Sequence, residues 1–77
     1  METYRVQVIV EQDEDGVYVV EAPAVPGCYS QGRTFEEALA NIQEVISMCL
    51  REMIEDGQPI DPSHPEVVGI KVLEVAV

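Results

Sequence analysis

The sequence is short of positive charge: its 77 residues include 4 Lys and Arg against 15 Asp and Glu, a formal net charge of −11. Affinity for nucleic acid comes mainly from Lys and Arg that neutralise phosphates, and anionic membrane surfaces attract the same residues. The basic residues also fall in four separate segments, as Arg5, Arg33, Arg51 and Lys71. The composition therefore argues against direct binding to nucleic acid or membranes. It favours a basic protein partner, although acidity also serves solubility alone.

Cysteine and long apolar runs are scarce as well. Cys28 and Cys49 are too few for a disulfide framework and do not have the spacing of a metal knuckle. No apolar run reaches the roughly 18 residues that a membrane span needs, and the first residues do not resemble a secretory signal. We therefore expect a cytoplasmic chain with reduced thiols, in which both cysteines serve packing.

The length limits the number of domains. Separate cores rarely form in fewer than about 50 residues each, so a chain of 77 residues has room for one. We expect a single domain over residues 1–77, with no C-terminal DNA-binding domain. Chains of this size bury only about 60% of their unfolded surface, which favours association with a second subunit.

Residues 3–32 carry the pattern of three short strands. Apolar or aromatic residues alternate with mostly polar ones in residues 3–11, and residues 17–22 begin with four β-branched or aromatic residues. The acidic segment between them ends in Asp15-Gly16, a pair typical of hairpin turns. Pro23 ends the second strand because proline cannot donate to a ladder, and residues 28–32 form a third.

A single long helix follows the predicted strands. Thr34 can cap its first turn, with Glu37 three residues later, and apolar residues then recur every three or four positions from Ala38 to Ile54. Gly57 is placed to end the helix. A proline-rich loop covers residues 58–66. The apolar residues that follow it, in residues 67–77, predict a final strand.

The predicted order is β-β-β-α-β, an α+β fold with a four-stranded mixed sheet and one helix on one face. The last strand is expected parallel to the first, on its free side. One helix leaves the other face of the sheet uncovered, and both faces carry apolar residues. Open sheet edges also pair readily with copies, so we expect a homo-oligomer, a dimer or a larger assembly.

No set of residues predicts a catalytic or metal site. Glu11, Asp13 and Glu44 are carboxylates of the kind that a metal-dependent nuclease needs, but the sequence does not place a convergent trio. The acidic turn has its glycine at the fourth position, whereas an EF-hand loop has it at the sixth. His64 has no neighbouring Cys or second His, and Ser63 is merely adjacent to it. We expect no enzyme activity, no metal and no cofactor.

Several of these motifs together resemble the HicB antitoxin family. The resemblance covers roughly residues 4–55 and is carried by Tyr4-Arg5-Val6, residues 11–20, Pro26-Gly27-Cys28, Ser30-Gln31-Gly32, Thr34-Phe35-Glu36-Glu37-Ala38 and Asn41-Ile42. It implies a partial ribonuclease H-like fold, in agreement with the element order. It also implies a chain that binds and neutralises HicA, a small basic toxin that cleaves messenger RNA. Many members carry a further DNA-binding domain, which the 77 residues leave no room for.

The resemblance and the charge together predict an antitoxin that covers the RNA-binding and active surface of a basic toxin. The candidate partner-binding residues are the acidic hairpin and two residues of the third strand: Glu11, Asp13, Glu14, Asp15, Ser30 and Gln31. A solvated hairpin explains the acidic residues equally well. The alternatives are an orphan homo-oligomeric scaffold protein without a toxin and, less favoured, a metal-dependent nuclease.

Overall fold

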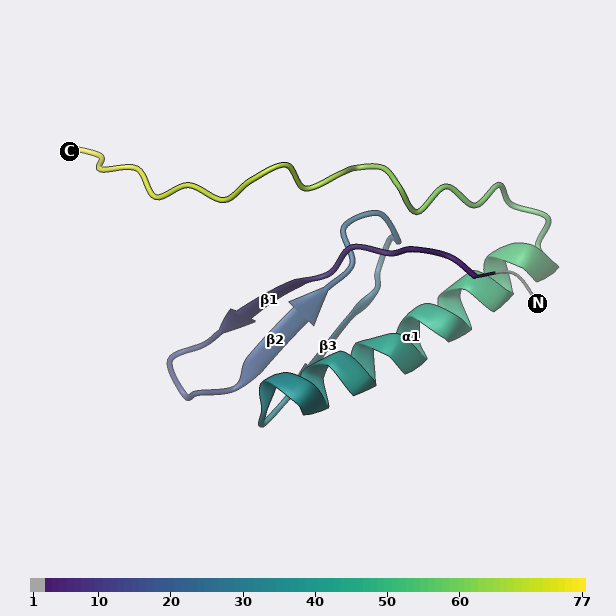
Figure 1. Cartoon of the computed structure of the whole chain (residues 1–77), viewed down its shortest axis with the longest axis horizontal. Helices are drawn as coiled ribbons and strands as arrows, with labels where there is room; N and C mark the ends of the chain where they lie inside the picture. Colours follow the sequence, from purple (N-terminus) through teal and green to yellow (C-terminus); the bar gives the residue numbers. More distant parts are fainter. Residues whose placement is uncertain (1–2) are drawn as a thin grey trace.

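The computed structural model describes residues 3–77, in which three strands and one helix form two layers. Strands β1 (Ile9–Gln12), β2 (Tyr18–Glu21) and β3 (Tyr29–Gly32) make an antiparallel sheet in the order β1-β2-β3. Helix α1 (Phe35–Glu55) lies across one face of this sheet (Figure 1). The three antiparallel strands and the single helix confirm that part of the expected fold.

The turn between β1 and β2 is held by its own aspartate. The Asp13 carboxylate accepts hydrogen bonds from the backbone N–H groups of Asp15 at 2.9 Å and Val17 at 3.0 Å. Gly16 has a φ of +84°, a backbone conformation that residues other than glycine rarely adopt. The turn aligns Val10 with Val20 and so puts apolar residues of both strands on the face toward α1.

Strand β1 is shorter than the alternation of apolar and polar residues in residues 3–11 predicts, because its partner β2 is short. Ile9 pairs with Glu21, the last residue of β2, and Pro23 follows soon after. Residues 3–8 therefore have no neighbouring strand on that side, and they run as an extended segment next to α1.

Helix α1 has a defined start and end. The Thr34 side chain accepts a hydrogen bond from the Glu37 N–H at 3.0 Å, as expected of the cap residue. At the other end Gly57 has a φ of +70°, and its N–H bonds to the Ile54 carbonyl. The Gln58 N–H bonds to the Met53 carbonyl at 2.9 Å. These two bonds form a Schellman motif, which ends the helix.

Strand β3 and α1 approach each other closely at Gly32. A Cβ atom placed on Gly32 would lie 2.5 Å from the backbone nitrogen of Ala38, so only glycine fits there. Asn41 adds a bond between the same two elements, because its side-chain amide donates to the Gln31 carbonyl at 2.7 Å. The edge strand β3 is thereby fixed to the helix.

The core lies between the sheet and α1. Val20 and Ala38 are fully buried, and the other buried apolar residues surround them: Ala22, Val25, Cys28, Ile42 and Leu50. The loop between β2 and β3 joins this core through Val25, and the Ala22 N–H bonds to the Cys28 carbonyl at 2.9 Å. The opposite face of the sheet contributes no residue to this cluster.

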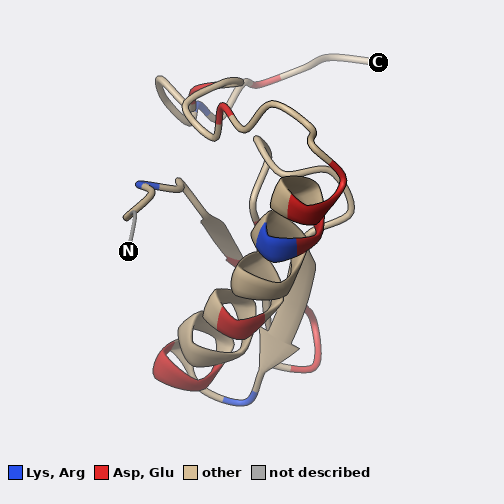
Figure 2. Ribbon diagram, turned by 90° about the vertical axis from the view of Figure 1, so that its right-hand side faces the viewer, with Lys and Arg blue, Asp and Glu red and all other residues tan. Residues whose placement is uncertain are grey.

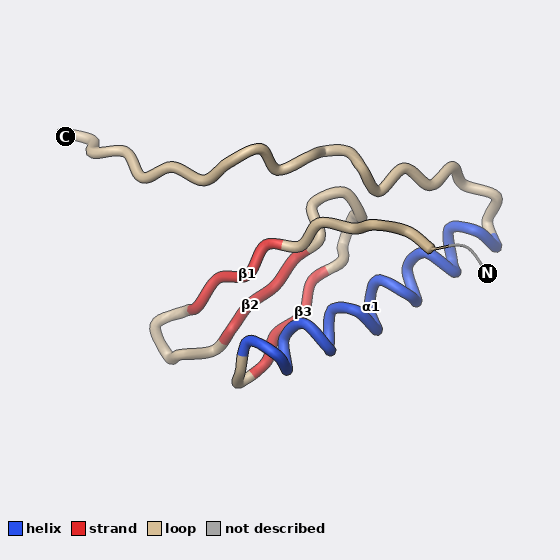
Figure 3. The backbone as a smooth tube through the Cα atoms, in the orientation of Figure 1, coloured by secondary structure: helices blue, strands red, loops and turns tan. Residues whose placement is uncertain are grey.

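The expected fourth strand does not form in the described residues. Residues 67–77, which we call the C-terminal arm, are extended but belong to no strand (Figure 3). The arm begins beside the first segment of the chain, where the Val67 N–H bonds to the Gln7 side-chain oxygen at 2.7 Å. This bond uses a side chain instead of the backbone of β1, so it does not start a ladder. The sheet is thus three-stranded and antiparallel, not four-stranded and mixed.

Candidate partner-binding surface

The face of the sheet that points away from α1 is open to solvent. Because Val10, Val20 and Ser30 are paired across the sheet and Val20 is fully buried, their neighbours in each strand point to the other side. We call this side the outer face, and it consists of Ile9, Glu11, Val19, Glu21, Tyr29 and Gln31.

The outer face combines apolar area with negative charge. The side chain of Tyr29 is 70% exposed and that of Val19 38% exposed. Glu11 is an exposed carboxylate that lies opposite Val19 on the neighbouring strand. Glu21 is also exposed and lies opposite Tyr29. Exposed aromatic residues are common anchors of protein interfaces, and flanking carboxylates select a basic partner.

Asp13, Glu14 and Asp15 of the acidic hairpin are all exposed, but Asp13 is also engaged in the hydrogen bonds of the turn. Asp13 directs its carboxylate into the turn, where it accepts the two backbone hydrogen bonds described above. Glu14 and Asp15 lie at the tip of the hairpin and are exposed. Glu11 belongs to the outer face next to this tip, so Glu11, Glu14 and Asp15 are available to a partner.

The two candidate residues of β3 point to opposite faces of the sheet. Ser30 pairs with the buried Val20 and is half-buried on the side of α1, whereas Gln31 pairs with Val19 on the outer face. The site residues taken from the sequence therefore do not form one surface. Sequence reasoning missed Val19, Glu21 and Tyr29, although pairing the strands with Val20 inward would have found them.

Basic residues do not gather on any face in residues 3–77. In Figure 2 the Lys and Arg positions are isolated from one another, while acidic residues recur along the helix and at the hairpin. The outer face itself contains two glutamates and no Lys or Arg. Its electrostatic potential is suited to a positively charged surface.

The carboxylates considered for nuclease chemistry lie apart. Glu11 is on the outer face of the sheet, Asp13 is in the turn, and Glu44 is exposed on α1, which covers the other face. Within residues 3–77 no three His, Cys, Asp or Glu side chains come together in a way that could hold a metal ion.

Asp61, Ser63 and His64 form a small cluster in the proline-rich loop. Ser63 donates to Asp61, and its Oγ lies 2.9 Å from Nδ1 of His64. The hydrogen bonds from Ser63 hold the pKa of the Asp61 carboxyl below its ordinary value. The side chains of Asp61 and His64 are both 73% exposed. Since the Ser63 hydroxyl directs its hydrogen bond to Asp61, its proton does not point to the imidazole of His64 as base catalysis would need.

Both cysteines are free and lie next to each other. Cys28 is buried and Cys49 half-buried. Burial, and then the neighbouring Cys49 thiol, raise the pKa of the Cys28 thiol from 9.0 to about 11. A thiol with so high a pKa is a poor nucleophile at neutral pH, which agrees with the packing role expected for it.

Comparison with known proteins decides the family. Residues 6–72 match the model of the HicB_like antitoxin of bacterial toxin-antitoxin systems. The chain belongs to the HicB-like antitoxin family. In the described residues no helix is long and apolar enough to cross a membrane.

Relatives of this HicB-like chain cover most of its length. A UPF0150 protein of Synechocystis sp. is 47% identical over 68 residues, which cover 88% of this chain and 90% of the relative. A UPF0150 protein of Thermoplasma acidophilum is 41% identical over 63 residues, with 82% of this chain and 91% of the relative covered. The crystal structure of the N-terminal domain of Burkholderia pseudomallei antitoxin HicB is also similar. Its TM-score is 0.64 at 27% identity, and the match covers 91% of this chain and 95% of that one.

Proposed function

We propose that this HicB-like chain binds and neutralises a small basic HicA-type toxin that cleaves messenger RNA. In this proposal it is a binding protein that acts in the cytoplasm, and it has no catalytic role, metal or cofactor of its own. Membership of the antitoxin family supports the proposal, and so does the similarity to the N-terminal domain of an antitoxin HicB.

The observation that carries the proposal is the outer face of the sheet. It is a continuous, solvent-exposed surface with Tyr29 and Val19 at its apolar part and Glu11 and Glu21 beside them. A toxin that binds RNA needs a cationic surface. Such a surface would pair with the glutamates, and its apolar atoms would be buried against the tyrosine.

The mechanism is occlusion. The outer face competes with RNA for the cationic surface of the toxin, and the exposed Glu14 and Asp15 extend the negative surface at the hairpin tip. The formal net charge of −11 speeds the encounter of the two proteins. No bond is made or broken, so inhibition is reversible and stoichiometric.

The test compares substitutions on the outer face with matched substitutions on α1. Tyr29→Ala and Glu21→Arg are expected to weaken toxin binding at least roughly tenfold each, which corresponds to about 1.4 kcal/mol of binding free energy. Binding is measured by titration calorimetry, and inhibition by cleavage of a labelled messenger RNA.

The matched controls are Met48→Ala and Glu44→Arg on α1. The first truncates an exposed large side chain, as Tyr29→Ala does, and the second replaces an exposed glutamate by arginine, as Glu21→Arg does. They should bind the toxin as the native chain does. Equal losses for both pairs would show that only net charge matters, and no loss for Tyr29→Ala and Glu21→Arg would contradict the proposed surface.

The alternative is an orphan homo-oligomer that serves as a scaffold without a toxin. The exposed apolar side chains of the C-terminal arm favour self-association of this kind. An adjacent open reading frame that encodes a small basic protein favours the antitoxin. Its absence, together with purification from native cells in which only this chain is recovered, favours the scaffold.

A further inference from the structure

The two cysteines of the chain belong to different elements that pack against each other. Cys28 comes from the loop between β2 and β3, is 3% exposed and belongs to the core. Cys49 lies on α1 and packs against the same core. Their side chains form a hydrogen bond with each other. The two sulfur atoms are therefore in contact, although the residues are far apart in the sequence.

The backbone on both sides fixes this contact. The Cys28 N–H donates to the Val25 carbonyl at 3.1 Å, and the Cys28 carbonyl accepts from the Ala22 N–H at 2.9 Å. Val25 and Ala22 are both buried, so this part of the loop belongs to the core. Cys49 is held by the helical backbone in the second half of α1. The fold itself thus holds the two thiols together.

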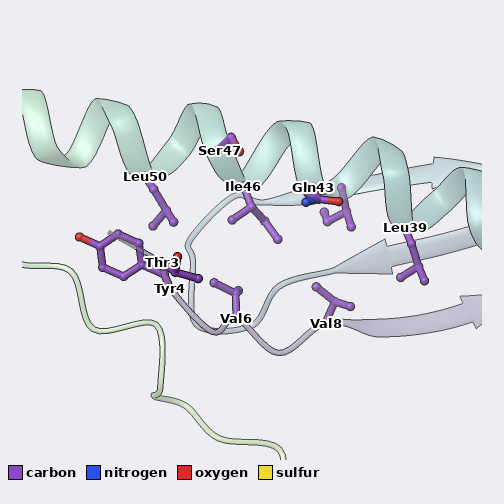
Figure 4. Close-up of a pocket in the computed structure, with 10 residues that line it drawn as sticks. Thr3, Tyr4, Val6, Val8, Leu39, Gln43, Ile46, Ser47 and Leu50 are labelled. Carbon is purple, nitrogen blue, oxygen red and sulfur yellow. The ribbon is translucent and has the colours of Figure 1, made fainter. Parts of the chain in front are cut away.

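Of the two thiols, Cys49 is the one that a small solute reaches. It lines an open pocket of about 240 Å³ at the end of α1, which also includes Pro26 of the β2–β3 loop. The larger groove of about 510 Å³, between residues 3–8 and α1, lies at another side of the helix and includes Ser47 (Figure 4). A solute that reacts with thiols meets Cys49 first, because Cys28 is buried.

The hydrogen bond between the thiols has a direction. Burial first, and then the charge of Cys49 and the hydrogen bond to it, raise the pKa of the Cys28 thiol to about 11. A bond that raises the pKa is made by the protonated form, so the Cys28 thiol donates and the Cys49 sulfur accepts. In the reduced chain Cys28 is therefore protonated and inert. Its proton points at the neighbouring sulfur, where a leaving group needs a proton once Cys49 is oxidised.

We propose that Cys28 and Cys49 are a reversible thiol–disulfide pair, which is oxidised by a hydroperoxide that reaches Cys49. Redox-sensing cysteines are accessible and often have a second cysteine next to them, and this pair has both features. The disulfide joins the β2–β3 loop to α1. A thiol reductant such as glutathione reverses it by exchange at the more exposed sulfur, that of Cys49.

The reaction balances in two steps. The Cys49 sulfur, as thiolate, attacks the peroxide: an S–O bond forms, the O–O bond breaks, water or an alcohol leaves, and Cys49 becomes a sulfenic acid. The Cys28 sulfur then attacks the Cys49 sulfur: the S–S bond forms, the S–O bond breaks, and the hydroxyl leaves with the Cys28 proton as water. The two thiols lose two electrons and two protons, which the peroxide gains. Contact between the sulfurs compensates for the weak nucleophilicity of a protonated thiol.

The disulfide stabilises the folded chain. It closes a loop that contains β3 and most of α1, and it restricts the unfolded chain more than the folded one. We expect oxidation to raise the midpoint of thermal unfolding by at least roughly 5 °C and to slow cleavage by proteases that act on the opened chain. A midpoint that does not rise would overturn the proposal.

Mass spectrometry after oxidation tests the pair directly. The reduced native chain is treated with hydrogen peroxide and denatured, and its remaining thiols are alkylated. We expect the single chain to lose the mass of two hydrogen atoms and to gain no alkyl group, peptide mapping to join Cys28 to Cys49, and dithiothreitol to restore both alkylated thiols. Two alkylated thiols after peroxide, a disulfide between two chains, or sulfinic acid on Cys49 with Cys28 still alkylated would overturn the proposal.

The matched control moves one thiol around the helix and keeps the number of cysteines. Successive helical residues turn by about 100°, so Cys49→Ser combined with Ser47→Cys brings the thiol to the groove side of α1 (Figure 4). This variant should be folded by circular dichroism and should form no disulfide within the chain. A disulfide as abundant as in the native chain would overturn the proposal, because the packed contact would then not be required.

The redox equilibrium gives a measurement that needs no variant. The equilibrium constant for forming the disulfide is measured in glutathione buffers, once without denaturant and once in concentrated urea. We expect it to be at least roughly tenfold larger in the folded chain, by the same linkage through which the disulfide stabilises the fold. A constant that is equal in both, or smaller in the folded chain, would overturn the proposal. No toxin is present in these measurements, so their outcome is separate from that of the proposed function.

Discussion

Gly32 shows how one missing side chain positions an edge strand. A Cβ atom there would lie 2.5 Å from the Ala38 nitrogen, and backbone atoms on both sides of the contact leave little room for adjustment. We expect Gly32→Ala to lower the free energy of unfolding by about 1–3 kcal/mol, as overpacking does in other cores. Chemical denaturation monitored by circular dichroism measures the change.

Gly69→Ala is the matched control for this prediction. No heavy atom lies within 4 Å of a Cβ placed on Gly69. Its substitution should leave the free energy of unfolding within about 0.5 kcal/mol of the native value, as is usual at exposed sites. If the two alanine variants were equally stable, the close approach of β3 to α1 would not be needed for the fold.

Several of the residues that carry the family resemblance have structural roles. Gly32 allows the close approach, Thr34 caps the helix, and Asn41 bonds the Gln31 carbonyl. Gly32 and Asn41 join β3 to α1, Thr34 begins the helix, and none of the three lies on the outer face. The motif therefore predicted the fold and the family well, but it could not predict which side chains a partner would contact.

At the scale of elements, the start of α1 depends on a single side-chain hydrogen bond. Thr34 Oγ1 accepts from the Glu37 N–H, one of the first backbone donors that have no partner within the helix. We expect Thr34→Ala to lower the free energy of unfolding by about 1 kcal/mol, the usual cost of losing such a cap. Thermal and urea unfolding measure the loss.

Thr34→Ser serves as the control for the cap. Serine keeps the hydroxyl group and should keep most of the stability, since Ser and Thr are both favoured cap residues. A loss for Thr34→Ser as large as for Thr34→Ala would show that the methyl group of Thr34, and not its hydroxyl, stabilises this end of α1.

The sequence was sufficient for the elements that depend on local signals. The Asp15-Gly16 turn, the threonine cap and the glycine end of α1 are all present as predicted, because turn and cap geometry depends on neighbouring residues. The prediction of a fourth strand was wrong for the sheet described here. Apolar alternation in residues 67–77 predicts an extended conformation but not its neighbour, because strand pairing depends on contacts between segments that are distant in the sequence.

For the molecule as a whole, the net charge of −11 would make the rate of the proposed toxin binding sensitive to salt. Exposed charges are screened beyond about 10 Å at 0.1 M ionic strength. We expect the association rate with a basic toxin to fall at least roughly tenfold between low and physiological salt, with a much smaller change in dissociation. Stopped-flow mixing over a salt series measures both rates, and an association rate that does not depend on salt would contradict electrostatic steering.

The proposed binding surface was only partly predictable from the sequence. Charge and the uncovered sheet face were both expected, but the turn geometry was needed to separate Asp13, which is engaged in hydrogen bonds of the turn, from Glu14 and Asp15. Asp13 is engaged in its own hairpin, whereas Glu21, which sequence reasoning passed over, lies beside Tyr29. Pairing register, which depends on contacts between strands, decides such cases.

The two-layer construction has a consequence for the lifetime of the unbound chain. The described molecule measures 18 Å along its shortest axis, so the sheet backbone lies one side chain away from water on its outer face. A bound partner would supply a third layer and shield that backbone. By mass action, a partner at a hundredfold excess over its dissociation constant stabilises the folded state by about 2.7 kcal/mol. Proteases that cleave the opened chain would therefore remove unpartnered copies first and leave the complexed pool intact.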